Sequence, residues 1–151
     1  MNSPRFVIGI DLGTTNSAVA YADLHEQAVS GVPRVRVFDV AQVSAPGEVT
    51  ALPTLPSFLY LLSPEDRASG RFALPWAPDP EGAVGVWARD QGALVPGRLV
   101  SSAKSWLCHD AVDRRARILP WGGDAPDEGR SPVEASAAYV AHLRAAWNHH
   151  M

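Results

Sequence analysis

FVIGIDLGTTNSAVAYA, residues 6–22, has the pattern of two strands joined by a polar turn. Phe6–Ile10 is a short continuous apolar run, which is typical of a strand buried on both faces, and it stops at Asp11. Residues 12–16 are rich in turn-forming types, and Ser17–Ala22 is a second run of small and apolar residues. The stretch therefore predicts a β-hairpin with a polar tip.

The tip of this hairpin carries groups that suit a nucleotide phosphate. Gly13 permits a close backbone approach and a positive φ, and the amides that follow it join the Thr14 and Thr15 hydroxyls as neutral donors. Asp11 would repel a polyphosphate unless a divalent cation lay between them. Mg²⁺ held through water by this carboxylate and by the phosphates removes the repulsion. The tip therefore suggests a nucleotide with its metal.

Two other phosphate-binding signatures are absent from the sequence. No glycine is followed, at P-loop spacing, by Gly-Lys-Ser or Gly-Lys-Thr, and Gly9 and Gly13 lack the glycine spacing of a dinucleotide fold. The plain alternative is an ordinary hairpin turn, because glycine and threonine are common in turns. An acid at the end of the first strand, Gly-Thr-Thr and a second strand together favour the phosphate-binding interpretation.

Downstream of the hairpin, the sequence predicts short elements separated by loops. Residues 35–40 alternate at period two, so we expect a third strand beside the hairpin with one solvated face, and residues 57–62 predict another strand. The chain has 13 prolines, and their positions favour loops over 45–56 and across 63–80. Helices are expected over 86–93 and from about 99 to 107.

The clearest helix follows Ser131. Ser131 caps it, Pro132 suits its first position, and Glu134 completes a capping box that satisfies two backbone amides. We expect this helix to cover 132–147. Its apolar positions at helical spacing predict a buried face made of Val133, Ala137, Val140, Leu143 or Arg144, and Trp147.

Composition and charge argue against several classes of function. The net charge of −3 and the pI near 5.9 provide no basic face for nucleic acid. The apolar runs are too short to span a membrane, so no membrane partner is expected and the default location is cytoplasmic. The single cysteine, Cys108, agrees with a reducing compartment, and we expect it to pack in the interior. His149 and His150 are adjacent at a helix end and are not expected to form a metal site.

Residues 8–20 closely resemble the opening of the seventy-kilodalton heat-shock chaperones of the DnaK type. These belong to the superfamily of actin, hexokinase and heat-shock ATPases. Looser matches follow in the family's order, namely residues 54–60, which resemble its Thr-Pro-Ser strand, residues 84–89, residues 101–107, and residues 131–147, which resemble the helix that closes its first subdomain. Lys104 falls on the family's catalytic lysine, and Ser105 stands where the family usually has arginine.

The resemblance implies an α/β fold, the first subdomain of an actin-like ATPase with the ribonuclease H-like fold, incomplete, with a mixed sheet and flanking helices. Residues 1–151 would form the N-terminal part of lobe I of a nucleotide-binding domain, without its second lobe or the peptide-binding domain. The implied cofactors are ATP or ADP and Mg²⁺. The implied site residues are Lys104 and Asp11 for catalysis, Asp11 for the metal, and Gly13, Thr14, Thr15 and Asn16 for the nucleotide.

By the same resemblance, the segment contributes the first phosphate loop and a catalytic lysine to the ATP hydrolysis that drives protein folding. Lys104 would orient attacking water and offset developing charge. Unfolded client polypeptides and cochaperones would bind through parts absent from this chain. The chain alone is not expected to hydrolyse ATP, because a single phosphate loop does not enclose the nucleotide.

Three other interpretations stay open. Sugar and polyol kinases of the same superfamily also begin with Gly-Ile-Asp, any residue, Gly-Thr-Thr, but they usually place a basic residue soon afterwards, where this chain has residues 16–20. Bacterial actin-like filament proteins have a similar loop that typically carries alanine at the position of Thr15. A noncatalytic interaction module is supported only by the missing second lobe.

Overall fold

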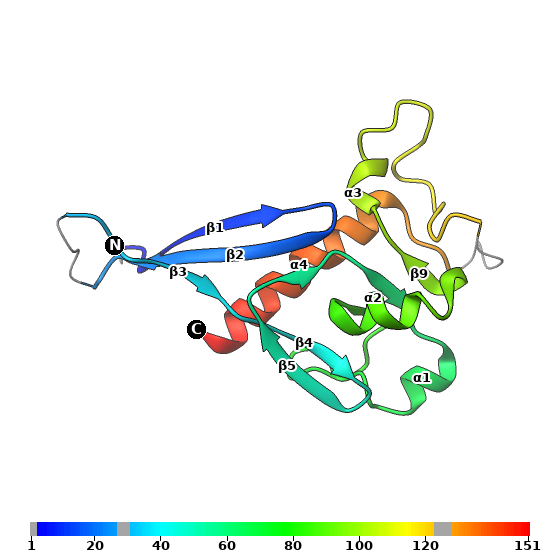
Figure 1. Ribbon diagram of the computed structural model, residues 1–151, viewed down its shortest axis with the longest axis horizontal. Helices are drawn as coiled ribbons and strands as arrows, with labels where there is room; N and C mark the ends of the chain where they lie inside the picture. The colour runs from blue at the N-terminus through cyan, green and yellow to red at the C-terminus, as the bar shows by residue number, and fades with distance from the viewer. Residues whose placement is uncertain (1–2, 27–30, 123–127) are drawn as a thin grey trace.

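The computed structural model describes residues 3–26, 31–122 and 128–151, and it is a mixed α/β structure with antiparallel sheets and a few helices (Figure 1). The strands are β1 (Phe6–Leu12), β2 (Asn16–Asp23), β3 (Val35–Phe38), β4 (Val40–Ala45), β5 (Glu48–Leu52), β6 (Leu55–Pro56), β7 (Leu59–Leu61), β8 (Gly82–Val84) and β9 (Leu99–Val100). The helices are α1 (Pro64–Ala68), α2 (Val86–Gly92), the 3-10 helix η1 (Pro96–Arg98), α3 (Ala103–Trp106) and α4 (Pro132–His150).

The α/β class is confirmed, but the strands described do not form the expected mixed sheet. Every pairing among them is antiparallel. Parallel neighbours need a crossover connection of a dozen or more residues, whereas the hairpins β1–β2 and β4–β5 are joined by tight turns. The local connections therefore determine the antiparallel order.

The first sheet confirms the hairpin and the third strand. β1 pairs with β2 along its whole length, with Ile10 opposite Val19, and β3 pairs with the other edge of β2. The alternation predicted for this third strand is also present, since Phe38 is buried whereas Val37 is exposed. The strand ends at Phe38, two residues earlier than expected, because Val40 already belongs to β4 in the second sheet.

β1 is not buried on both faces, so that part of the prediction is wrong. It is the edge strand of the first sheet, and Val7, Ile8 and Ile10 are 57%, 44% and 51% exposed. α4 packs against the sheet through Trp147, whose ring lies 5.4 Å from that of Phe6. A continuous apolar strand is buried on both faces only where both are covered. Here α4 covers the sheet at Phe6 and Tyr21, and Val7, Ile8 and Ile10 stay exposed.

The second and third sheets come from the chain between Val40 and Val100, which also supplies β6 of the first sheet. β4 and β5 form a hairpin around Gly47, whose φ of +83° suits a residue without a Cβ. The loop predicted over 45–56 is therefore wrong for β5 and for β6. The prolines in that stretch lie on either side of β5 and do not interrupt it. In the third sheet β7 lies between β8 and β9, which confirms the strand predicted near 57–62 in a shorter form.

The short helices agree in part with the predictions. α2 confirms the helix expected over 86–93, and α1 is a single short helix within the proline-rich stretch 63–80. That stretch is anchored by the buried Phe72, whose ring lies 4.4 Å from the ring of Trp87. The helix expected over 99–107 is limited to α3, because its first two residues form β9.

α4 begins where the capping box predicts. The Ser131 hydroxyl accepts a hydrogen bond from the Glu134 N–H at 3.0 Å, and the Glu134 carboxylate accepts one from the Ser131 N–H at 2.8 Å. This backbone hydrogen bond lowers the pKa of Glu134, because it favours the charged carboxylate. The helix continues to His150, three residues past the expected end.

The buried face of α4 differs from the predicted one. Its buried residues are Pro132, Ala135, Ser136, Tyr139, His142, Leu143 and Ala146. Of the predicted face, Leu143 is buried and Trp147 is partly buried, whereas Val133 and Val140 are each 39% exposed. Hydrophobic periodicity missed the true face, because it includes the buried polar residues Ser136 and His142 and leaves the apolar Val133 and Val140 exposed.

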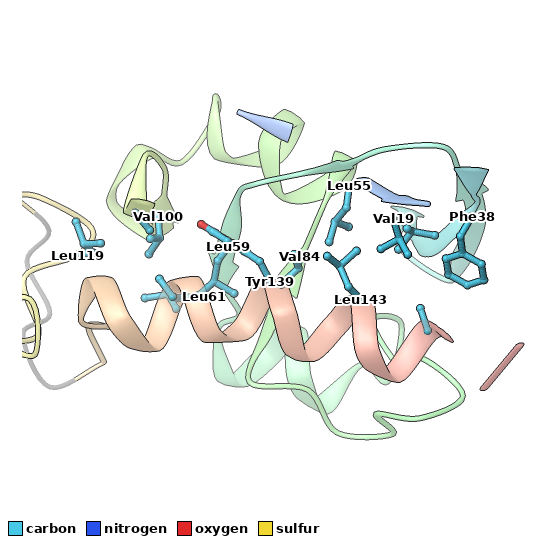
Figure 2. Close-up of a cluster of buried hydrophobic side chains, with 14 residues drawn as sticks. Val19, Phe38, Leu55, Leu59, Leu61, Val84, Val100, Leu119, Tyr139 and Leu143 are labelled. Atoms are coloured by element: carbon cyan, nitrogen blue, oxygen red, sulfur yellow. The ribbon is translucent and has the colours of Figure 1, made fainter. Parts of the chain in front are cut away.

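The core lies between α4 and the sheets. Figure 2 shows buried side chains along one side of the helix, from Val100 and Leu119 at one end to Val19 and Phe38 at the other. These side chains come from α4 itself, from all three sheets, from α3 and from the segment that precedes α4. The shared core therefore holds the three sheets on one helix, and the tip of the β1–β2 hairpin lies near α3 (Figure 1).

Cys108 and the two terminal histidines are all exposed. Cys108 is exposed as a free thiol, so its expected interior packing is wrong. The two terminal histidines pack separately on aromatic rings: His149 lies 5.6 Å from Trp76, and His150 lies 5.7 Å from Phe38, measured between ring centroids. Their rings thus contact different parts of the core.

His142 on α4 makes the stability of the fold depend on pH. Its buried ring lies with Nε2 2.9 Å from the Ala41 carbonyl, so the neutral ring donates this hydrogen bond. Burial lowers the pKa of His142 from its ordinary 6.5, and the hydrogen bond to Ala41 opposes this shift. The unfolded chain therefore binds the proton at a higher pH than the folded chain does. Stability from this group is complete above the unfolded pKa and is lost as the pH falls below it.

We expect acidification below about pH 6.5 to lower the free energy of unfolding, with up to about 1.4 kcal/mol per pH unit coming from His142. Urea denaturation at a series of pH values measures this slope. His142→Gln is the matched variant, because glutamine retains an N–H donor for Ala41 and does not titrate. An unchanged slope in the variant would refute the role of His142.

Candidate functional site

The tip of the β1–β2 hairpin is crowded at Gly13. A Cβ at this position would lie 2.0 Å from the main-chain oxygen of Asn16, so a side chain requires the backbone to move. The close approach predicted for Gly13 is therefore confirmed. The positive φ is wrong, since Gly13 is not among the residues with positive φ. Glycine is required here because a side chain would clash with Asn16, and not because the backbone is left-handed.

A buried serine clamps this turn from the following segment of the chain. Ser57 donates its N–H to the Thr15 carbonyl at 2.8 Å and its hydroxyl to the Gly13 carbonyl at 2.9 Å. The Ser17 hydroxyl lies 3.0 Å from the Ser57 hydroxyl, and both serines are buried. β6 pairs with the start of β2 and so brings Ser57 to the turn. A satisfied buried network of this kind rigidifies the loop that it supports.

Lys104 reaches the same turn from α3. Its ammonium donates to the Leu12 carbonyl, with Nζ 2.5 Å from the oxygen, across 92 positions of sequence. α3 is anchored by the buried Ala103, and it follows Ser102, which has a left-handed φ of 53°. Non-glycine residues rarely adopt this conformation, which costs energy and is common at functional sites. The fold thus brings Lys104 to the predicted phosphate loop.

The turn exposes hydrogen-bond donors, and three of its main-chain acceptors are occupied. The main-chain oxygens of Leu12, Gly13 and Thr15 accept hydrogen bonds from Lys104 or Ser57. Within the residues that the structure describes, the N–H groups and hydroxyls of Thr14 and Thr15 donate no hydrogen bond, and both residues are exposed. Free N–H and hydroxyl donors beside an ammonium group suit an anion. The carbonyls of Leu12, Gly13 and Thr15 already accept hydrogen bonds and so repel the anion less.

Asp11 and Asn16 flank the turn on its two strands. Asp11 is the penultimate residue of β1, Asn16 is the first residue of β2, and both are exposed. Asp11 takes no part in the salt bridges of the described residues. Across ranges 3–26, 31–122 and 128–151, no group of three or more His, Cys, Asp or Glu side chains could hold a metal ion. Asp11 therefore offers a single carboxylate.

All the site residues predicted from sequence lie at this turn or contact it, namely Asp11, Gly13, Thr14, Thr15, Asn16 and Lys104. Sequence reasoning did not assign Ser17 and Ser57 to the site. A signal existed for Ser57, which is a polar residue at the head of the apolar run 58–62. Such a residue needs a buried partner, and the turn supplies one.

A groove of about 1200 Å³ lies elsewhere, between α4 and the segment from α1 to β8. Its lining includes Trp76, His142 and the ion pair between Arg67 and Asp79. The lining of this groove includes neither residues 11–16 nor Lys104. The turn therefore lies apart from this groove.

The chain matches no protein-family model, and no curated protein matches its sequence. None of the helices in the described ranges combines the length and apolar character needed to cross a membrane. The geometry of the turn and of Lys104 is therefore the basis for a functional assignment.

Proposed function

We propose that this chain is the ATP-binding segment of a heat-shock-type molecular chaperone with an actin-like nucleotide-binding domain. In this proposal, residues 11–16 form the first phosphate loop and Lys104 is the catalytic lysine. The observation that carries it is the turn itself, with occupied carbonyls, free donors on Thr14 and Thr15, and the Lys104 ammonium 2.5 Å from the Leu12 carbonyl. The activity would be ATP hydrolysis coupled to protein folding in the cytoplasm, with client polypeptides and cochaperones as partners.

Lys104 supplies the positive charge of the proposed site. Its ammonium donates to a neutral carbonyl, and a phosphate oxygen is the stronger acceptor because it is charged. The side chain is exposed, so its Nζ can move from Leu12 to a phosphate oxygen without disturbing the core. There it would orient attacking water and offset the charge that develops during phosphoryl transfer.

Asp11 fits a magnesium ion that is held through water. Mg²⁺ usually keeps several waters and binds one or two carboxylates together with the substrate phosphates, so a single carboxylate is sufficient. Asp11 is exposed, it is free of salt bridges among the described residues, and it is adjacent to the donors of the turn. The ion would neutralise the repulsion between this carboxylate and the polyphosphate.

We expect Asp11→Asn to weaken binding of ATP with magnesium roughly tenfold, or about 1.4 kcal/mol, when magnesium is scarce. Asparagine preserves the shape of the side chain but loses the charge that holds the hydrated ion. Raising the magnesium concentration should restore part of the affinity by mass action. Chemical-shift titration of the chain with ATP across a magnesium series measures both effects.

The matched control for this experiment is Asp39→Asn, which removes an exposed carboxylate between β3 and β4 and should leave the affinity unchanged. Equal affinity of Asp11→Asn and the parent chain at every magnesium concentration would contradict the proposed role of Asp11. An equal loss in both variants would indicate a general charge effect and would also contradict it.

A further inference from the structure

Ser102 adopts a backbone conformation that glycine normally occupies. Its φ of 53° and ψ of 26° lie in the left-handed region, and no other non-glycine residue in the described part of the chain has a positive φ. A side chain in this region brings Cβ close to the following carbonyl oxygen, which costs free energy. A strained residue persists only where the surrounding structure holds it. The structure around Ser102 therefore has to account for its conformation.

The side chain of Ser102 does not compensate for the strain. Its hydroxyl makes no capping bond to α3, and within the described ranges it makes no other hydrogen bond. The residue is also exposed, so it fills no space in the core. Short polar side chains stabilise the left-handed conformation through a local hydrogen bond, and Ser102 lacks one. The conformation is therefore imposed by the backbone on either side.

Buried residues hold the backbone on both sides of Ser102. Val100 is fully buried in β9, opposite Leu59 of β7, and Ala103 at the start of α3 is 1% exposed. Both Val100 and Ala103 belong to the same core cluster. The chain has only residues 101 and 102 in which to leave the sheet and begin the helix. A left-handed residue turns the backbone sharply enough for this short connection.

The turn at Ser102 determines where Lys104 points. α3 has four residues, which is too short for a helix to be stable by itself, so its direction depends on how its first residue is attached. Consecutive helical residues are about 100° apart around the axis, so Lys104 lies to the side when Ala103 faces the core. From this position its ammonium reaches the Leu12 carbonyl. The direction of α3 thus brings Lys104 to the turn of residues 11–16.

We propose that Ser102 is a positioning residue for Lys104, because its Cβ confines the start of α3 to a narrow range of directions. The left-handed region open to a residue with a Cβ is small, whereas glycine samples a broad range of positive and negative φ. Serine therefore fixes the direction of α3 at some cost in stability, as is common where function requires a strained site. The position of Lys104 is independent of nucleotide, and its effect on catalysis rests on the proposed function.

Ser102→Gly is expected to raise the folding equilibrium constant about twofold to fivefold, because relief of the strain exceeds the entropy that glycine adds to the unfolded chain. Ser101→Gly is the matched control. Ser101 is adjacent and does not have a positive φ, so glycine there should lower the constant by a similar factor. Urea denaturation measures both changes. A Ser102→Gly variant less stable than the parent chain would show that no strain is stored at Ser102 and would overturn the proposal.

The Leu12 carbonyl reports the position of Lys104 in the absence of nucleotide. Its ¹³C chemical shift depends on the hydrogen bond from the Lys104 ammonium, and Lys104→Ala provides the value without this bond. Ser102→Gly should move the shift part of the way toward this value and should lower the ¹⁵N order parameters of residues 103–106 from roughly 0.85 toward 0.6. Ser102→Ala keeps the Cβ and should match the parent chain. An unchanged shift and unchanged order parameters in Ser102→Gly would overturn the proposal, as would equal changes in Ser102→Ala.

Single-turnover hydrolysis in a polypeptide that joins this segment to a second phosphate-binding lobe separates this proposal from the proposed function. Ser102→Gly should lower the rate about threefold to tenfold with unchanged affinity for ATP, and Ser102→Ala should retain the parent rate. In a Lys104→Ala background, Ser102→Gly should cause no further loss, because it acts through Lys104. A further loss would overturn the positioning role. A parent rate in Lys104→Ala alone would contradict the proposed function, and the Leu12 shift would still decide whether Ser102 positions Lys104.

Discussion

Lys104→Ala is expected to lower the single-turnover rate of ATP hydrolysis by about 10²-fold in a polypeptide that joins this segment to a second phosphate-binding lobe. The charge of Lys104 would act mainly in the transition state, where negative charge is redistributed, so the affinity for ATP should change only modestly. Lys104 already lies at the turn through its hydrogen bond to Leu12, and removal of the side chain leaves the core intact because Lys104 is exposed.

Two comparisons make the Lys104 experiment specific. Raising the magnesium concentration should restore part of the activity of Asp11→Asn but none of the activity of Lys104→Ala, because only the first variant loses a metal contact. Arg98→Ala removes another cation, six positions before Lys104 in the sequence, and it should leave the hydrolysis rate unchanged because Arg98 bonds to Leu61 and Glu128 and not to the turn. Hydrolysis by Lys104→Ala at the parent rate would contradict the catalytic role and would show that Lys104 is an ordinary surface lysine.

Gly13→Ala is expected to lower the free energy of unfolding by about 1–3 kcal/mol and to abolish phosphate binding at the turn. The added Cβ would lie 2.0 Å from the Asn16 main-chain oxygen, so the turn must open. Opening it would also strain the hydrogen bonds that Ser57 makes to Gly13 and Thr15. Urea denaturation and titration with ATP measure the two losses on the same sample.

Gly9→Ala is the matched control for Gly13→Ala. A Cβ at Gly9 in β1 would lie 4.0 Å from the nearest atom, the Ala20 oxygen, which is ordinary contact. This variant should therefore keep the stability of the parent chain or gain slightly, because alanine restricts the unfolded chain more than glycine does. Equal unfolding free energies for the two variants would refute the steric account of Gly13.

Features with local signals could be predicted from the sequence. The β1–β2 hairpin depends on two apolar runs and a turn within 17 residues, 6–22, and the start of α4 depends on Ser131 and Glu134 three positions apart. The site residues around Gly13 belong to this local part. Lys104 was assigned by resemblance alone, since spacing gives a single lysine no role. The structure shows only that Lys104 contacts the turn at Leu12.

Features that depend on distant contacts could not be predicted. The exposure of β1 depends on which elements cover the sheet. A continuous apolar run in the sequence does not show whether its strand is covered on one face or on both. The buried face of α4 was missed because it includes the polar Ser136 and His142, whose burial hydrophobic periodicity does not predict. Ser57 could not be assigned to the site from the sequence, because β6 brings it to the turn by pairing with β2, about 40 positions away in sequence.

The measurement that tests the central proposal most directly is a chemical-shift titration of the ¹⁵N-labelled chain with ATP and magnesium, up to about 10 mM nucleotide. We expect shifts centred on the amides of Gly13, Thr14 and Thr15, with affinity weaker than micromolar because the turn is exposed and a single loop does not enclose the nucleotide. Lys104→Ala should change these shifts and Arg98→Ala should not. Amides of the turn that stay unchanged throughout the titration would contradict the assignment of residues 11–16 as a phosphate loop.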